Sequence, residues 1–311
     1  MRKRISRIAG IVLCVGLLAG GLSGCGKSDE AILKSGISAM KEAKSYEMEG
    51  SYSGTMILTE GEEPATEVKL ETKISEVFFQ EPFRAKVTSK MTADSQTAAE
   101  VTTYVNSTGE QYDVYTNTYG TWSKVTLQDS VNAMAEAGLG TYMMQQFSDD
   151  MSRYVKKEDK VEGDNSYLVY EYTFSQEEVL QRMKEMLRSW GSNSLTGEAK
   201  VVTEEVAKSI SDMKATLILD RKTKSLVRVE YPVSELVTKT IRSMLDAMAS
   251  IQEEDVAESG EGEHVMSLQE ALAQLKIEAK DMVLVVTYKN LDHATDFEIP
   301  KEVLEAESEV K

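Results

Sequence analysis

The fold is decided by residues 46–58, which read Tyr46-Glu47-Met48-Glu49-Gly50-Ser51-Tyr52-Ser53-Gly54-Thr55-Met56-Ile57-Leu58. Between Met48 and Met56 every second position is apolar or glycine, and the positions between them carry carboxylates or hydroxyls. Successive side chains of a β-strand point to opposite faces. The alternation therefore predicts a half-buried strand, with one face on the core and one face in water.

Further strand-like runs follow this one with short gaps. They lie near 66–79, 83–92, 98–106, 111–118, 120–126, 153–161, 166–174, 213–220, 225–231 and 276–288, with a final edge at 297–299 that Pro300 ends. Turn signals such as Glu81-Pro82 and Gly163-Asp164-Asn165 separate neighbouring runs. Because the gaps are short, we expect antiparallel neighbours joined by hairpins.

Helical patterns interrupt the strands at several places. One helix face carries Ile32, Leu33, Ile37 and Met40, and other helical stretches lie near 129–148, 175–190 and 235–249. Ser175 and Glu178 have the spacing of a capping box, which predicts that the third helix begins there. The order of elements predicts an α+β fold, a large curved antiparallel sheet (a half-barrel) with helices packed on its concave face.

The first 24 residues carry the signals of an exported protein. A basic start of four Arg and Lys residues precedes the apolar run 8–22, which is shorter than the roughly 20 residues of a membrane-spanning helix. This order is typical of a signal peptide. Leu22-Ser23-Gly24-Cys25 resembles the lipobox of bacterial lipoproteins, in which a lipid is attached to the cysteine and the chain is cut before it. A plain secretory signal that contains a cysteine is the alternative.

The lipobox implies a particular mature chain. Residues 1–24 would be removed, residues 25–30 would be the lipidated Cys25 and a short tether, and residues 31–311 would form one domain. Cys14 would be discarded, so we expect no disulfide and no zinc site. Two acyl chains on Cys25 give stable anchoring, which predicts a protein held on the extracytoplasmic face of a cell membrane.

The mature chain is strongly acidic. Loss of the four basic residues of the signal takes the net charge from −17 to −21. Such a surface repels phosphates, so we expect neither nucleic acids nor anionic lipid headgroups as partners. Acidic residues gather at 252–263 without the alternating spacing and fixed turn of a calcium loop, which favours a solvated loop over a calcium site.

The sequence contains no recognised catalytic motif. His264 lies in the acidic loop, and His293 follows a turn-like Asn290-Leu291-Asp292. Neither histidine fits a metal-binding or nucleophile pattern, and there is no P-loop, dinucleotide fingerprint or protease motif. We therefore expect no enzymatic activity, no metal and no cofactor.

The methionine content is the one feature of the composition that indicates ligand binding. The chain has 16 methionines, and this flexible, polarizable side chain recurs on surfaces that accept varied apolar ligands. We expect the strand 46–58 and the helix 175–190 to line a shared apolar space, through Met48, Tyr52, Met56, Met183, Met186 and Trp190. Ordinary filling of the core is the alternative interpretation of the same residues.

Several short motifs resemble the LolA/LppX-type lipoprotein carriers and sensors. They are the helix after the lipobox and the strand with Tyr46 and Gly50, the hairpins at 112–124 and 219–226, and the ending Tyr288-Lys289-Asn290 with Phe297-Glu298-Ile299-Pro300. The resemblance covers most of 31–303 and implies a half-barrel around an apolar cavity that can hold acyl chains. The length of the chain and the helical insertions at 129–148 and 175–211 depart from the family pattern.

Three functions follow as hypotheses. The first is a module that binds a lipid or another amphiphile under its helices. The second is an envelope sensor or protein-interaction lipoprotein with a filled core and a protein partner that the sequence does not identify. The third is an envelope hydrolase, which would need a cluster of convergent acids or histidines in a cleft.

Overall fold

The computed structural model describes residues 28–109, 111–118, 120–128, 146–181, 211–243, 245 and 275–306. The signal sequence, Cys25, the acidic loop 252–263 and His264 lie outside these residues. Most of the helical stretch predicted at 129–148 lies outside them too, and the described residues 146–148 form a turn and a bend.

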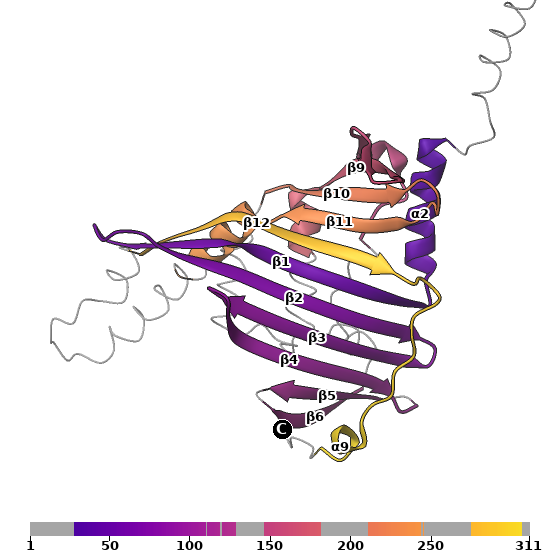
Figure 1. Cartoon of the computed structure of the whole chain (residues 1–311), viewed down its shortest axis with the longest axis horizontal. Coiled ribbons are helices and arrows are strands. Elements are labelled where there is room, and N and C mark those ends of the chain that lie inside the picture. Colours follow the sequence, from indigo (N-terminus) through magenta and orange to yellow (C-terminus); the bar gives the residue numbers. More distant parts are fainter. Residues whose placement is uncertain are drawn as a thin grey trace, which may run out of the picture.

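One antiparallel sheet of twelve strands dominates the described chain (Figure 1). Its strands are β1 (Ser45–Glu60), β2 (Thr66–Gln80), β3 (Phe83–Ala93), β4 (Gln96–Ser107), β5 (Tyr112–Thr118), β6 (Thr121–Leu127), β7 (Tyr154–Lys156), β8 (Lys160–Glu162), β9 (Asn165–Phe174), β10 (Met213–Asp220), β11 (Leu226–Pro232) and β12 (Leu275–Lys289). The order is β6-β5-β4-β3-β2-β1-β12-β11-β10-β9-β7, with β8 paired to β9. Because the order does not return to its start, the sheet stays open.

The predicted alternation sets the two faces of this sheet. On β1, Tyr46 lies opposite Phe78 and Met48 lies opposite Glu76 of β2, while on the other side Met48 lies opposite Tyr288 of β12. These even-numbered positions of β1 share the face on which the main apolar core is built. We call this the inner face, and the opposite side the outer face.

Helices pack on the inner face, as the sequence predicts. Helix α2 (Asp29–Glu42) begins after Ser28, whose hydroxyl accepts a hydrogen bond from the Ala31 backbone N–H at 3.2 Å. Its buried residues are Ile32, Leu33, Gly36, Ile37 and Met40, and all but Gly36 belong to the inner-face core. A Cβ on Gly36 would lie 2.9 Å from Leu219 Cδ2 and 3.2 Å from the Leu226 backbone nitrogen. The glycine therefore allows α2 to lie close against the β10–β11 hairpin.

Two further helical segments, 176–181 and 234–243, also contribute to the inner-face core. The capping box is confirmed, because the Glu178 backbone N–H donates to the Ser175 hydroxyl at 3.3 Å and the Ser175 N–H donates to the Glu178 carboxylate at 2.8 Å. The second segment is fixed to β12 through the Ser234 hydroxyl, which accepts from the Met282 backbone N–H at 2.7 Å.

The prediction of one strand at 153–161 is wrong. Two three-residue strands, β7 and β8, pair with different parts of β9, and residues 157–159 between them are not in a strand. The 3-10 helix η1 (Met151–Arg153) precedes β7 and is capped by Asp150, whose carboxylate accepts from the Ser152 backbone N–H at 3.0 Å.

The predicted edge strand at 297–299 is also wrong. This stretch has no strand partner. The chain after β12 runs past the strand ends at one side of the sheet (Figure 1), and Phe297 and Ile299 pack with Tyr104, Tyr115 and Trp122 on the outer face. Pro300 ends no strand; it is the N-cap of the short helix α9 (Lys301–Leu304), which packs Val303 into the same cluster. The aromatic outer face gives these side chains a place to be buried that needs no strand pairing.

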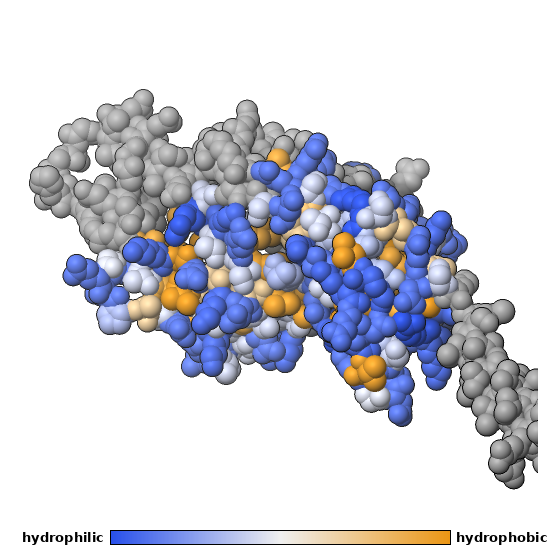
Figure 2. Space-filling view, turned by 90° about the horizontal axis from the view of Figure 1, so that it is seen from above, coloured by the Kyte–Doolittle hydropathy of each residue, from blue (hydrophilic) through white to orange (hydrophobic). Residues whose placement is uncertain are grey.

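No helix in the described part of the chain has the length and apolar character needed to cross a membrane. Hydrophilic side chains cover most of the described surface in the view of Figure 2, and apolar ones reach it in small groups between them.

Candidate functional site

The predicted ligand-lining residues of β1 all lie on the inner face, and their burial falls along the strand. Tyr46 and Met48 are buried at one end, with exposed fractions of 1% and 2%. Tyr52 and Met56, further along, are only partly buried and pack against the same core. The inner face therefore has a closely packed end and a half-buried apolar end.

Tyr52 and Met282 form the centre of the half-buried end. The Tyr52 hydroxyl donates to Met282 Sδ at 2.7 Å, and burial raises the pKa of Tyr52. Met282 reaches this position because β1 and β12 shift register between Ser53 and Thr55. A Cβ on Gly54 would lie 2.8 Å from Met282 Cα and 3.0 Å from the Lys280 carbonyl oxygen, so Gly54 is needed for the close approach of the two strands.

Met183, Met186 and Trp190 lie outside the described residues. That they line a shared space with β1 therefore stays a prediction. On the β1 side, the half-buried end combines a thioether, a phenol and apolar side chains, which suits contact with an apolar ligand more than with a charged one.

Glu76 is a buried carboxylate on the inner face that reasoning from the sequence missed. Its exposed fraction is 1%, and it accepts a hydrogen bond from the Tyr46 hydroxyl. Tyr46 stacks on Phe78 with ring centroids 5.0 Å apart. A buried charge is costly unless it is hydrogen-bonded, so the phenol is part of what allows a carboxylate here.

The sequence did contain a signal for Glu76. The inner-face positions of β2 are Val68, Leu70, Thr72, Ile74, Glu76 and Phe78, and Glu76 is the one charged residue among them. Nearby Tyr288 is buried, and burial raises its pKa well above the ordinary value, with the neighbouring Tyr231 and Glu76 adding to the shift. This end of the inner face thus holds a polar centre inside an aromatic core.

The inner face over β7–β10 is filled by aromatic rings. Ring centroids lie 5.5 Å apart in Phe147–Tyr172, 4.8 Å in Tyr154–Tyr172 and 4.7 Å in Tyr172–Phe174. Arg153 lies over the Tyr172 ring at 4.7 Å and donates two hydrogen bonds of 2.7 and 2.6 Å to Glu178. This pairing lowers the pKa of Glu178 to about 2.

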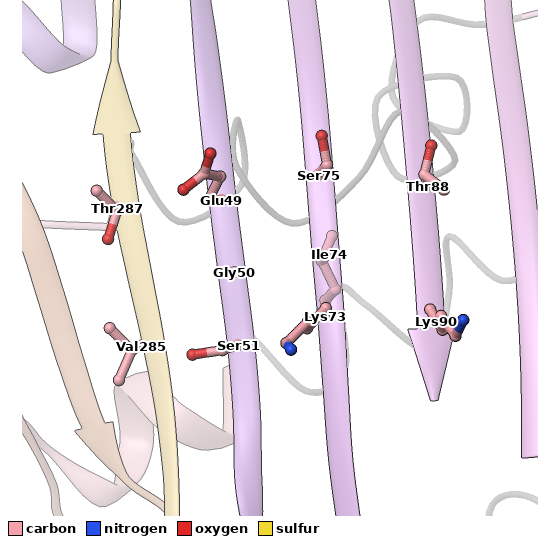
Figure 3. Close-up of a pocket in the computed structure, with 10 residues that line it drawn as sticks. All are labelled: Glu49, Gly50, Ser51, Lys73, Ile74, Ser75, Thr88, Lys90, Val285 and Thr287. Carbon is pink, nitrogen blue, oxygen red and sulfur yellow. The ribbon is translucent and has the colours of Figure 1, made fainter. Parts of the chain in front are cut away.

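A hollow of about 400 Å³ lies on the outer face across β12, β1, β2 and β3 (Figure 3). Its lining is rich in hydroxyls and contains two opposed lysines: Glu49, Gly50, Ser51, Lys73, Ile74, Ser75, Thr88, Lys90, Val285 and Thr287. Each charged side chain has an opposite charge beside it. Lys73 Nζ lies 3.0 Å from Glu71, Lys90 Nζ 3.9 Å from Glu100, and Glu49 2.7 Å from Lys289 Nζ. The charges are balanced, so the hollow has no strong preference for a charged ligand.

The described residues contain no group of three or more His, Cys, Asp and Glu side chains that could hold a metal ion. His293 lies in a turn, where its backbone N–H donates to the Asn290 carbonyl at 2.9 Å. Nothing at this turn places the imidazole in a catalytic arrangement with the residues described above.

These features define an α+β protein whose open antiparallel sheet carries an apolar inner face beneath helices. The chain belongs to DUF6612, a family of unknown function, whose sequence profile matches residues 28–234. No curated protein matches the sequence.

Several solved structures are similar to this chain. The lipoprotein LppX of Mycobacterium tuberculosis has 11% identity and a TM-score of 0.37, with 86% of this chain and 97% of that chain covered. LprF of Mycobacterium bovis has 11% identity and a TM-score of 0.35, with 88% and 96% covered. A LolA superfamily protein of Nitrosomonas europaea has 11% identity and a TM-score of 0.19, with 88% and 96% covered. LppX-type and LolA-type proteins, which the sequence motifs resemble, are thus both among these similar structures. The fold class of this chain is assigned from its own strand order and register.

Proposed function

We propose that the mature protein is a lipoprotein, anchored through Cys25 on the extracytoplasmic face of a membrane, that binds a lipid or another amphiphile on the inner face of its sheet. The observation that carries this proposal is the half-buried row on β1 and its neighbours, with Tyr52, Met56, Leu70, Ile74 and Leu284 packed against the core yet incompletely covered. Large apolar surface left partly open on a folded protein marks a place for a ligand or partner.

The energy available on such a row is sufficient for useful binding. Each buried methylene contributes about 0.8 kcal/mol. About ten methylenes would therefore contribute about 8 kcal/mol, which corresponds to a dissociation constant near 1 μM before the costs of immobilisation. Only methylenes that the row removes from water contribute in this way, so the affinity depends on how much of the acyl chain the protein covers.

A second function is favoured by a different observation. The packed end of the inner face is closed by aromatic side chains and helix α2, and Tyr46, Tyr172 and Phe174 have exposed fractions of 1% or less. If the helical insertions fill the half-buried end in the same way, the protein is a filled-core sensor or interaction lipoprotein with no small ligand.

The test is native mass spectrometry of the soluble domain that begins at Ser28, followed by lipid extraction. We expect an added mass that organic solvent releases as an amphiphile. Met56→Glu places a charge on the half-buried row and should abolish the added mass. Ser53→Glu puts the same charge on an exposed position of the same strand and should retain it. A wild-type protein with no added mass and no extractable lipid would favour the filled-core alternative.

A further inference from the structure

One row of inner-face side chains crosses five neighbouring strands at the half-buried end. Tyr52 of β1 lies opposite Leu284 of β12 on one side and Thr72 of β2 on the other. The row continues through Met91 of β3 to Ala99 of β4, and these strands lie side by side in Figure 1. Neighbouring strands are about 4.8 Å apart, so the row is about 19 Å long. We call it the Tyr52 row.

The Tyr52 row is buried at one end and accessible at the other. Beyond Leu284 the next residue across the sheet is Tyr231 of β11, which is 1% exposed. Tyr52 and Leu284 are partly buried and pack against the core, whereas Met91 is 39% exposed. Apolar surface thus remains available along the row, in the direction of β3 and β4, for an apolar chain that lies across the strands.

The inner face around this row carries no charge in the part of the chain that the structure describes. The inner-face positions are uncharged from Gly50 to Leu58 on β1, from Val68 to Ile74 on β2 and from Val87 to Ala93 on β3. The buried carboxylate of Glu76 lies further along β2, at the packed end. Because an ion buried without a partner costs far more than a neutral group, we expect the ligand to be uncharged where it meets Tyr52.

The Tyr52 hydroxyl is a donor with a weak partner. It donates to Met282 Sδ at 2.7 Å, and a thioether sulfur is a weak acceptor. Among the described residues this hydroxyl makes no other hydrogen bond, and the hydroxyl of Thr72 on the opposite strand makes none. Burial raises the pKa of Tyr52, so the hydroxyl keeps its proton. A carbonyl or hydroxyl oxygen from a ligand would be a better acceptor than the sulfur.

We propose that Tyr52 is the polar anchor of the ligand, and that its hydroxyl turns from Met282 to a neutral oxygen of an amphiphile whose acyl chain lies along the Tyr52 row. This inference rests on the proposed function. It adds the residue that holds the polar group, the direction of the chain across the strands and the class of ligand, which is an uncharged acyl ester or alcohol.

The test is a competition between two probes whose chains have the same length. Methyl hexadecanoate carries an ester, and octadecane is the matched alkane with no oxygen. Both are added in equal amounts to the full lipidated chain in detergent, and native mass spectrometry after release from the detergent gives the ratio of bound ester to bound alkane. Both probes compete for the same folded molecules, so this ratio does not depend on how much of a variant is folded.

Tyr52→Phe removes the donor and should lower the ratio of ester to alkane about fivefold, the value of one hydrogen bond. Tyr112→Phe is the matched control. It removes a phenol from the inner face at the packed end, where the ring of Tyr112 lies 5.2 Å from that of Phe83, and it should leave the ratio unchanged. Equal ratios in the wild type and in Tyr52→Phe overturn the anchor.

Met282→Leu tests the exchange of acceptors from the other side. Leucine keeps the volume of methionine and removes the sulfur that competes with the ligand oxygen, so the ratio of ester to alkane should stay the same or rise. A fall as large as that in Tyr52→Phe would show that the sulfur, and not the freed hydroxyl, favours the ester, and this would overturn the proposal.

The outcomes separate the anchor from the binding function. A wild-type chain that binds both probes, with a ratio that Tyr52→Phe leaves unchanged, refutes the anchor and leaves the proposed function in place. A wild-type chain that binds neither probe and yields no extractable lipid refutes the proposed function and the anchor with it.

Discussion

Replacement of Gly54 by alanine tests the close approach of β1 and β12 that shapes the half-buried end. Alanine in place of glycine within a strand gains about 0.5–1 kcal/mol from the smaller loss of chain entropy. Against this, the new Cβ would lie 2.8 Å from Met282 Cα and 3.0 Å from the Lys280 carbonyl oxygen. Both are backbone atoms, so relief requires a shift of β12 and not merely a new rotamer.

The steric effect should exceed the entropic gain. Overpacking of this kind costs about 1–3 kcal/mol, and β12 is constrained on its other side by the Met282 backbone N–H, which donates to Ser234. We expect Gly54→Ala to lower the free energy of unfolding by about 1–2 kcal/mol net, measured by urea denaturation followed by circular dichroism.

Gly50→Ala is the matched control for Gly54→Ala. The nearest atoms to its Cβ are side-chain carbons of Ile74, at 3.3, 3.8 and 3.9 Å, so the free energy of unfolding should change by less than about 0.5 kcal/mol or rise. Equal losses in the two variants, or a more stable Gly54→Ala protein, would refute the argument that the approach of the two strands requires glycine.

Three further predictions concern an ion pair, a buried hydrogen bond and the anchor. The folded-state pKa of Glu178, about 2, lies below its ordinary value of 4.5. The pairing of Glu178 with Arg153 therefore stabilises the fold above about pH 4.5, and this stabilisation is lost as the pH falls toward 2. In urea titrations Arg153→Ala should lower the unfolding free energy at pH 7 and much less at pH 2.5, and a loss that does not depend on pH would contradict this. Tyr46→Phe removes the hydroxyl that donates to buried Glu76 and should lower the unfolding free energy by about 1–3 kcal/mol. A variant whose melting temperature equals that of the wild type would show that this hydrogen bond contributes nothing to stability. Cys25→Ala should move the protein from the membrane fraction to a soluble or uncleaved form, and unchanged detergent-dependent fractionation with unchanged mass would exclude Cys25 as the anchor.

The two candidate functions differ in what occupies the half-buried end of the inner face. Burial along β1 is complete near Tyr46 and Met48 and partial near Tyr52 and Met56. An amphiphile would complete the burial from outside the chain, whereas a filled core would complete it from within. The Met56→Glu and Ser53→Glu pair separates these, because a charge on the inner face should disturb ligand binding in the first case and folding in the second.

Local pattern in the sequence was sufficient to predict the secondary structure of most described elements. The strands predicted at 46–58, 66–79 and 83–92 match β1, β2 and β3 to within two residues at each end. The capping box at Ser175 and Glu178 was predicted from spacing alone and has both of its hydrogen bonds. Alternation and capping depend on neighbours one to four residues away, so the sequence by itself determines them.

Tertiary structure alone decided which elements that are distant in the sequence meet. Alternation tells which side chains of β1 share a face, but not that its second neighbour is β12, more than 200 residues later. The same limit explains Glu76, whose buried position depends on a phenol from another strand, and the stretch 297–299, whose apolar side chains pack on the outer face without strand pairing. An apolar side chain is stabilised by burial on either face of the sheet, so the sequence pattern does not distinguish the two faces. Only the packing of distant elements determines on which face these side chains are buried.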